Sequence, residues 1–297
     1  MNRLLILLVA IAAATTVLAE DPSDWTTSPP PFRIADNLYY VGSRDLAAYL
    51  VTTPDGNILI NANLDTSPPQ IRASVEKLGF RWADTKILLN SQAHFDHVGG
   101  AAEVVRETMA RNYVMTGDDV AMRSGGRDDF AYRIEGLRAY TPVEVDRVLQ
   151  DGDKITLGGV TLTAHRTAGH SRGCTTWTMD VHVPGEPTGK LRHVVIVGGW
   201  APLPHYQLVD APGHPASYPG IADDFRHTFA TLHALPCDIF LGAHGLYFDL
   251  LPKLQRMPKE GAAVFIDPTG YQKAVSEAEA DFQEMYDKQR AAITPNH

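Results

Sequence analysis

The sequence predicts a single α+β domain with two β-sheets at its centre and helices outside. Candidate strands follow one another early in the chain and then alternate with candidate helices, an order that packs as sheets beneath helical layers. No repeat of solenoid length and no linker divides the chain. With 297 residues and 44% hydrophobic side chains, the chain can bury a large core without disulfides or metal ions to staple it.

Residues 1–19 have the three parts of a secretory signal peptide. Residues 1–3 supply one positive charge, residues 4–13 are uninterrupted apolar residues, and residues 17–19 carry the compact side chains of a cleavage site. The apolar stretch is short for a membrane span, so a retained anchor helix is the less favoured alternative. We expect cleavage to leave residues 20–297 as one domain in the periplasm.

The charge and the cysteines narrow the function further. A net charge of −9 and the absence of any basic run argue against a nucleic-acid partner, because phosphate binding requires clustered Lys and Arg. Export permits a disulfide between Cys174 and Cys237, but two distant cysteines leave the pairing open. Cys237 precedes an apolar run, which favours a buried free thiol.

The first half of the chain reads as an extended lead-in over residues 20–32, then strands, then alternating elements. Asp55-Gly56 lies between two apolar runs, which is a hairpin signal. Ile71, Val75 and Leu78 have helical spacing. The expected strands are residues 38–41, 48–52, 57–61 and 86–90, and the expected helices are residues 69–79 and 101–110. Residues 124–133 read as a long loop, a frequent place for recognition.

The second half alternates in the same way. Gly158-Gly159 separates two short strand patterns and predicts a hairpin. The expected strands are residues 154–157, 160–163, 175–179, 194–197 and 239–241. Helices are expected over residues 221–235 and, closing the chain, 275–292.

A dense group of metal-ligand residue types directly follows the strand expected at 86–90. His94, Asp96 and His97 fall within four positions, after Gln92. Two further histidines, His170 and His244, each lie beside glycines next to an expected strand, and glycine lets the backbone turn sharply. Imidazole nitrogen and carboxylate oxygen are zinc ligands, and catalytic zinc sites keep a position for water. The other histidines read as ordinary surface or core residues: His165, His182, His193, His205, His214, His227, His233 and His297.

This run at residues 92–97 resembles the His-x-His-x-Asp-His signature of the metallo-β-lactamase superfamily, with Gln92 in the first His position. The resemblance implies a four-layer αβ/βα sandwich with two zinc ions at one edge of the sheets. Many members carry a bridging aspartate in a later Gly-Asp pair, whereas residues 194–200 contain no acid. That departure resembles the third subclass of class B β-lactamases, in which His97 would bind the second zinc. Residues 169–177, 218–225, 235–238 and 265–271 also resemble this subclass.

The resemblance implies two sets of zinc ligands. The first is Gln92, His94 and His170, and the second is Asp96, His97 and His244. Glutamine in the first position resembles the glutamine-bearing, GOB-like branch of the subclass. Because a neutral amide oxygen is a weaker zinc ligand than imidazole, we expect the first site to hold its zinc less tightly.

The implied activity is hydrolysis of the β-lactam amide bond of penicillins, cephalosporins and carbapenems, which confers antibiotic resistance. Zinc would lower the pKa of a water to about 7, and Asp96 would orient that water and help move its proton.

Trp200 stands where relatives often have serine, and Trp200, Phe130 and Tyr247 are candidate substrate contacts, with ordinary packing as the alternative. We expect a small-molecule substrate and a monomer. The competing functions are another hydrolase on the same fold, acting on a lactone, ester or thioester, and a non-catalytic exported zinc-binding protein.

Overall fold

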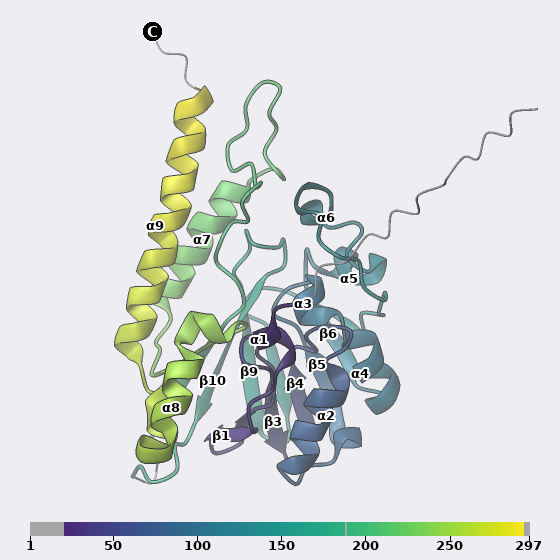
Figure 1. The fold of residues 1–297 in the computed structure, drawn as a ribbon, viewed down its shortest axis with the longest axis vertical. Coiled ribbons are helices and arrows are strands. Elements are labelled where there is room, and N and C mark those ends of the chain that lie inside the picture. Colours follow the sequence, from purple (N-terminus) through teal and green to yellow (C-terminus); the bar gives the residue numbers. More distant parts are fainter. Residues whose placement is uncertain (1–20, 188, 294–297) are drawn as a thin grey trace, which may run out of the picture.

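Two β-sheets lie at the centre of the fold in the computed structural model, which describes residues 21–187 and 189–293 (Figure 1). The first sheet has the order β1 (Phe32–Ala35), β2 (Leu38–Tyr40), β3 (Tyr49–Thr53), β4 (Gly56–Ile60), β5 (Thr85–Leu89), β6 (Arg111–Met115) and β7 (Arg147–Leu149). The second has the order β12 (Ile239–Gly242), β11 (Arg192–Val197), β10 (Thr175–Val181), β9 (Val160–Arg166) and β8 (Lys154–Leu157). Pairing is antiparallel from β1 to β4 and parallel from β4 to β7, while in the second sheet only β11 and β12 are parallel.

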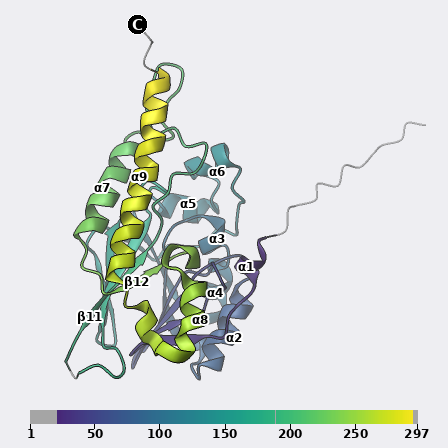
Figure 2. The same cartoon turned by 60° about the vertical axis from the view of Figure 1, so that its left-hand side comes forward.

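Helices cover the outside of both sheets. In Figures 1 and 2, α2 and α4 lie on one side of the strands and α7 and α9 on the other. The helices are α1 (Ser23–Thr26), α2 (Pro68–Lys77), α3 (Phe95–Val98), α4 (Ala101–Thr108), α5 (Asp119–Ser124), α6 (Phe130–Glu135), α7 (Ile221–Ala234), α8 (Leu250–Glu260) and α9 (Pro268–Ile293). Short 3-10 helices span Trp82–Asp84, Gly245–Phe248 and Gly261–Phe265. The predicted α+β class and the αβ/βα sandwich are therefore confirmed.

The alternation of side chains along β4 shows how the layers form. Ile58 and Ile60 point into the core shared by the two sheets, while Leu59 points into a second core beneath α2 and α4. In β5, Leu88 joins Leu59 in that second core and Leu89 faces the other sheet. Successive residues of a strand face opposite sides, so apolar residues at every position place a strand between two buried layers.

Three expectations about local structure were wrong in part. Phe130 begins a helix where a loop was expected, because the Asp129 carboxylate accepts a hydrogen bond from the Ala131 N–H at 2.7 Å and caps α6. The lead-in contains the short helix α1, and β1 begins at Phe32. The closing helix starts at Pro268, a residue well suited to the first helical position.

The structure adds elements that the sequence pattern did not predict. These are β6, β7, α3, α5 and α8. α8 contains Pro252 in its first turn and Pro258 near its end. Because proline usually breaks a helix, these two residues made a helix hard to predict here, although both lie near a helix end.

The signal-peptide prediction lies outside the described residues. Within the described ranges, none of the helices combines the length and apolar character that a membrane crossing requires. Cys174 and Cys237 are both free, and Cys174 is buried. Burial raises the pKa of both thiols, to about 12 for Cys237.

Candidate metal centre

The predicted metal ligands come from three connections that end at the same edge of the two sheets. Residues 92–97 follow the carboxyl end of β5, and α3 begins at Phe95 within this segment. His170 lies in the connection between β9 and β10, and His244 follows β12. Gly169 enters the turn before His170 with φ +130°, and a Cβ at this position would lie 2.7 Å from the Phe225 ring. Glycine is therefore required there by both backbone conformation and space.

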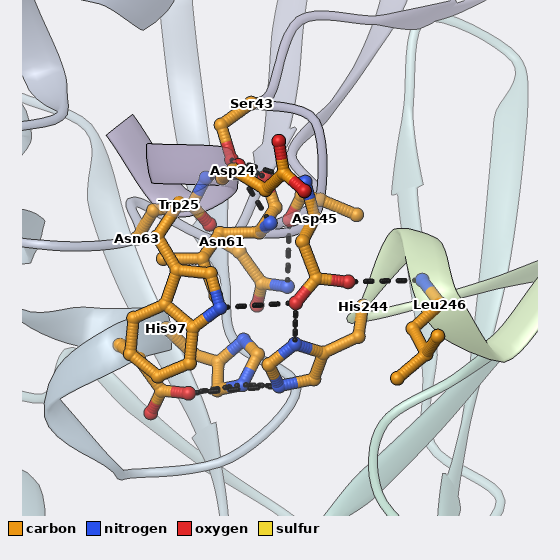
Figure 3. A network of polar contacts seen from close by, with 12 residues as sticks. Asp24, Trp25, Ser43, Asp45, Asn61, Asn63, His97, His244 and Leu246 are labelled. Carbon is orange, nitrogen blue, oxygen red and sulfur yellow. Dashed lines mark hydrogen bonds and ion pairs between the residues drawn. The ribbon is translucent and has the colours of Figure 1, made fainter. Parts of the chain in front are cut away.

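Asp96, His97 and His244 converge most closely. The two Nε2 atoms of His97 and His244 are 3.1 Å apart. The Oδ2 atom of Asp96 lies 3.3 Å from Nε2 of His97 and 3.5 Å from Nε2 of His244. Figure 3 shows the two imidazoles facing one another, with a carboxylate beside them. These three residues are separated by up to 148 positions in the sequence and meet only because the two sheets pack together.

This geometry fits a zinc ion. Ligand atoms held about 2.0–2.2 Å from zinc at tetrahedral angles lie about 3.3–3.6 Å from one another, close to the separations found here. Nδ1 of His244 lies 3.0 Å from the Asp45 carboxylate, and this contact places the ring proton on Nδ1, from which it is donated to Asp45. The lone pair of Nε2 is then available for a metal ion. Two buried imidazole nitrogens facing each other beside a carboxylate are readily explained by a cation between them.

Gln92, His94 and His170 form a second cluster beside the first. The rings of His94 and His170 are 4.8 Å apart between centroids. Nδ1 of His170 lies 2.7 Å from the Ala201 carbonyl oxygen, which it can satisfy as a donor, so its Nε2 remains available. The Gln92 amide donates to the Gly198 carbonyl at 3.4 Å, while its buried Oε1 atom has no hydrogen-bond partner. Because an unpaired buried amide oxygen is costly, the site fits a ligand role for that oxygen.

The electrostatics of the cluster follow from burial and from the neighbouring charges. Burial acts to raise the pKa of Asp96, but the charge of His97 and the hydrogen bond with His244 hold this pKa well below its usual range. The pKa of His97 lies below its ordinary value, because burial and the charge of His244 together outweigh the opposing effect of Asp96. Burial and the charge of His94 lower the pKa of His170 to about 3. Burial opposes a raised pKa at His244, but Asp45 and Asp96 raise it to about 9.

A buried carboxylate that the sequence did not reveal joins the two loops of the Gln92 cluster. Asp118 is 1% exposed and accepts hydrogen bonds from the backbone N–H of Ala93 at 2.9 Å and of Gly173 at 2.7 Å. Its third donor is the Ser171 hydroxyl at 2.7 Å. Burial, together with the charge of Asp129, raises the pKa of Asp118 to about 6. Ser171 is thus a structural residue that joins its loop to Asp118.

Asp129 is a further carboxylate that sequence reasoning missed. One of its carboxylate oxygens lies 3.8 Å from Nε2 of His94, and each of the two side chains is only 4% exposed. Burial acts to lower the pKa of His94, but Asp129 raises it above its ordinary value. Carboxylates that contact a ligand histidine fix its ring orientation. Neither Asp118 nor Asp129 stands out in the sequence, because acidic residues in connections are usually solvent-exposed.

The three candidate substrate contacts have different surroundings. Trp200 is 7% exposed and packs against Tyr247, with ring centroids 4.9 Å apart. The Tyr247 ring in turn lies 5.2 Å from the His244 ring. Phe130, by contrast, packs against Tyr206 and Tyr218 at 5.0 and 4.8 Å. Tyr247 therefore lies beside the metal cluster with Trp200 packed against it, whereas Phe130 packs against Tyr206, whose hydroxyl donates to the His170 carbonyl at 2.6 Å.

A sandwich of two sheets with buried histidines and carboxylates at one edge defines a class of metal-dependent hydrolases. Residues 44–182 match the metallo-beta-lactamase superfamily. Native FEZ-1 metallo-beta-lactamase from Legionella gormanii is 46% identical, with a TM-score of 0.84 over 89% of this chain and 98% of that one. GOB-18 from Elizabethkingia meningoseptica is 35% identical, with a TM-score of 0.80 over 93% and 99%.

A third solved structure, the class B3 di-zinc enzyme LRA-12 from an Alaskan soil metagenome, is 32% identical, with a TM-score of 0.80 over 90% of this chain and 98% of that one. This chain belongs to the metallo-β-lactamase superfamily, and it resembles the enzymes of subclass B3. Its identity to FEZ-1 exceeds that to GOB-18, so the resemblance to the glutamine-bearing branch rests on Gln92 itself.

Proposed function

We propose that this protein hydrolyses the amide bond of β-lactam antibiotics with zinc held at the edge of its two sheets, and so confers resistance to them. The observation that carries the proposal is the convergence of Asp96, His97 and His244, whose ligand atoms lie within 4.8 Å of one another. The family relationship to FEZ-1, GOB-18 and LRA-12 supports the same activity.

We propose two zinc sites of unequal strength. Asp96, His97 and His244 form the stronger one, and Gln92, His94 and His170 the weaker one. An amide oxygen is a neutral ligand in a position where imidazole nitrogen suits zinc better. The enzyme with a single zinc ion, bound by the Asp96 set, is expected to be active.

Opening a β-lactam ring needs a nucleophilic water, a partner for the developing oxyanion and a proton for the departing nitrogen. Bound zinc would supply Lewis acidity and a water whose pKa is lowered to about 7. Asp96 is ionised at neutral pH, since its pKa lies well below the usual range. Its carboxylate can therefore accept a hydrogen bond from the attacking water, orient it, and carry its proton towards the leaving nitrogen.

The walls of the site are a further part of the proposal. Tyr247 lies beside His244 with Trp200 packed against it, and the two rings would offer apolar contacts to the groups that surround a β-lactam ring. An indole cannot reproduce the hydrogen bond of the serine found at this position in relatives, so Trp200 would contact substrate through its ring. A contact between substrate and Phe130 stays a prediction, because its ring packs against Tyr206 and Tyr218.

The test uses purified protein with a penicillin, a cephalosporin and a carbapenem, before and after treatment with a chelator. We expect hydrolysis of the β-lactams, its loss on chelation and its recovery when zinc is restored. A panel of lactones, esters and thioesters measured in parallel separates this activity from other hydrolases of the same fold. Cleavage that survives removal of divalent ions would exclude the proposal.

The proposal includes the compartment and the oligomeric state. Residues 1–19 would direct export and be removed, so that the mature enzyme acts as a monomer in the periplasm. The mass of the protein recovered from the periplasm should match a chain that begins at Glu20. Sedimentation of that protein should give a single monomeric species.

A further inference from the structure

The carboxylate of Asp45 makes contact with two separate segments next to the metal cluster, the turn that contains His244 and the segment that contains Trp25. Its Oδ2 atom lies 3.0 Å from Nδ1 of His244 and also accepts a 3.0 Å hydrogen bond from the indole Nε1–H of Trp25. Its Oδ1 atom accepts the backbone N–H of Leu246 at 2.9 Å. Figure 3 shows these contacts on two sides of one carboxylate. The hydrogen bonds of this carboxylate therefore hold His244, the turn after it, and Trp25.

The bond to His244 fixes which nitrogen faces the cluster. With Nδ1 on Asp45, the opposite nitrogen, Nε2, points at His97 and Asp96. The bond to Leu246 prevents the turn after His244 from rotating the ring away. Asp45 itself is not a member of the metal-ligand group, so it acts through His244.

The indole of Trp25 comes from the first segment of the chain that the structure describes. Its ring lies 6.1 Å from the His244 ring and 6.3 Å from the Phe95 ring. The segment is attached by backbone hydrogen bonds, from Asp45 N–H to the Asp24 carbonyl at 3.0 Å and from Arg44 N–H to the Thr27 carbonyl at 2.8 Å. The amino-terminal segment thus reaches the metal cluster through the hydrogen bond of Trp25 to Asp45 and through the contact of the Trp25 ring with His244.

We propose that Asp45 is a positioning residue for the second zinc site and that Trp25 fixes the orientation of the Asp45 carboxylate. The inference rests on the metal centre proposed above. A carboxylate that accepts a hydrogen bond from the N–H of a ligand imidazole restrains the ring and increases its basicity, and loss of such a partner typically costs about 10–100-fold in metal affinity. The Trp25 indole should contribute less, because it acts on the carboxylate rather than on the ligand.

The experiment measures zinc affinity at the second site directly. A His170→Ala background weakens the first site, and competition with a chromophoric chelator then gives the Zn²⁺ dissociation constant. In this background Asp45→Asn is expected to raise the dissociation constant by about 10–100-fold, and Trp25→Phe by a smaller but measurable factor of up to about tenfold. The absorption spectrum of the Co²⁺-substituted protein should change in Asp45→Asn, since the spectrum reports the arrangement of ligands around the ion.

Asp24→Asn is the matched control, because it makes the same chemical change next to this network. The Asp24 side chain contacts Arg44 at 3.5 Å, and only the Asp24 backbone takes part in the network. We expect its zinc affinity and Co²⁺ spectrum to equal those of the background protein. An Asp45→Asn protein that is less stable without metal but binds Zn²⁺ with unchanged affinity would overturn the proposal.

Two outcomes separate this inference from the proposed function. Unchanged zinc affinity in Asp45→Asn, with β-lactam hydrolysis intact in the parent protein, rejects the positioning role alone. A parent protein that binds no zinc rejects both. Should Asp45→Asn fail to fold, Trp25→Phe decides the matter, because it retains an aromatic ring against Phe95 and removes only the donor to Asp45. Parental affinity in that variant would then overturn the proposal.

Discussion

Gln92 and Asp96 show how much chemistry depends on single side chains at this site. Gln92 is 2% exposed, and its amide nitrogen bonds to the Gly198 carbonyl, which turns the Oε1 atom away from that partner. Asp96 is 9% exposed and lies between two imidazoles. In the proposed zinc sites, Gln92 would set how firmly one cluster holds a metal ion, and Asp96 would contribute both a ligand and an ionised carboxylate.

Replacing Gln92 with histidine should strengthen the first zinc site. An imidazole nitrogen in place of an amide oxygen gives zinc a better ligand. We expect the parent protein to retain about one zinc ion per chain after extensive dialysis and Gln92→His to retain about two. Metal content by mass spectrometry checks this, and two ions retained by the parent protein would contradict it.

Replacing Asp96 with alanine should remove most of the activity. The change deletes a ligand and the group that orients the water, so kcat is expected to fall about 10²–10⁴-fold. The measurement is steady-state hydrolysis of a chromogenic cephalosporin at saturating zinc. Asp65→Ala, at an exposed position, is the control and should keep the parental rate. Near-full turnover by the Asp96 variant would show that its role is assigned wrongly.

At the scale of elements, the site depends on connections that are joined to one another. Asp118, just before α5, binds the backbone beside Gln92 and the loop that contains His170. Asn61, just after β4, similarly donates to the Ala47 carbonyl at 3.2 Å and accepts the Ser91 N–H at 2.9 Å. Buried polar side chains of this kind replace the sheet hydrogen bonds that a connection lacks.

Ser171→Ala should destabilise the protein through Asp118. The serine hydroxyl is one of three donors to this buried carboxylate, and loss of a donor leaves part of its charge unsatisfied. We expect a decrease of about 1–3 kcal/mol in the free energy of unfolding, measured by urea denaturation of the metal-free protein. Ser276→Ala, at an exposed position of α9, is the matched control and should change stability little. Equal stability of the two variants would argue against the importance of the Asp118 contacts.

At the scale of the whole molecule, the two sheets share one core. It includes Tyr49 and Leu89 from the first sheet, Trp177 and Ile196 from the second, and Phe282 from α9. Because one apolar core is continuous across both sheets, we propose that residues 20–297 form a single domain. The metal ligands come from both sheets, so zinc binding should be linked to the folding of the entire domain.

Zinc should therefore stabilise the folded state, and a chelator should remove that stabilisation. A ligand that binds only the native protein, present at one hundred times its dissociation constant, adds about 2.7 kcal/mol to the free energy of unfolding. Urea denaturation at fixed free zinc and in the presence of chelator measures the difference. The Asp96→Ala protein should gain much less from zinc. Equal gains in the two proteins would show that zinc binds elsewhere.

By itself, the sequence determined the fold class, most of the long elements and the identity of the predicted metal ligands. Consecutive apolar residues at 58–60 in β4 and 87–89 in β5 identify strands buried on both faces, and His94, Asp96 and His97 are recognisable because they lie close together in the chain. Local patterns of this kind reflect the periodicity of strands and the chemistry of side chains, which neighbouring residues are sufficient to specify.

Only the tertiary structure decided which side chains hold these ligands in place. Asp45 and His244 are 199 positions apart and Asp118 and Ser171 are 53 apart, and no local pattern marks either pair. The same acidic side chains would be ordinary solvated residues if the sheets did not pack face to face. Packing buries Asp118 and half-buries Asp45, and removal from water is what makes a specific hydrogen-bonding partner necessary.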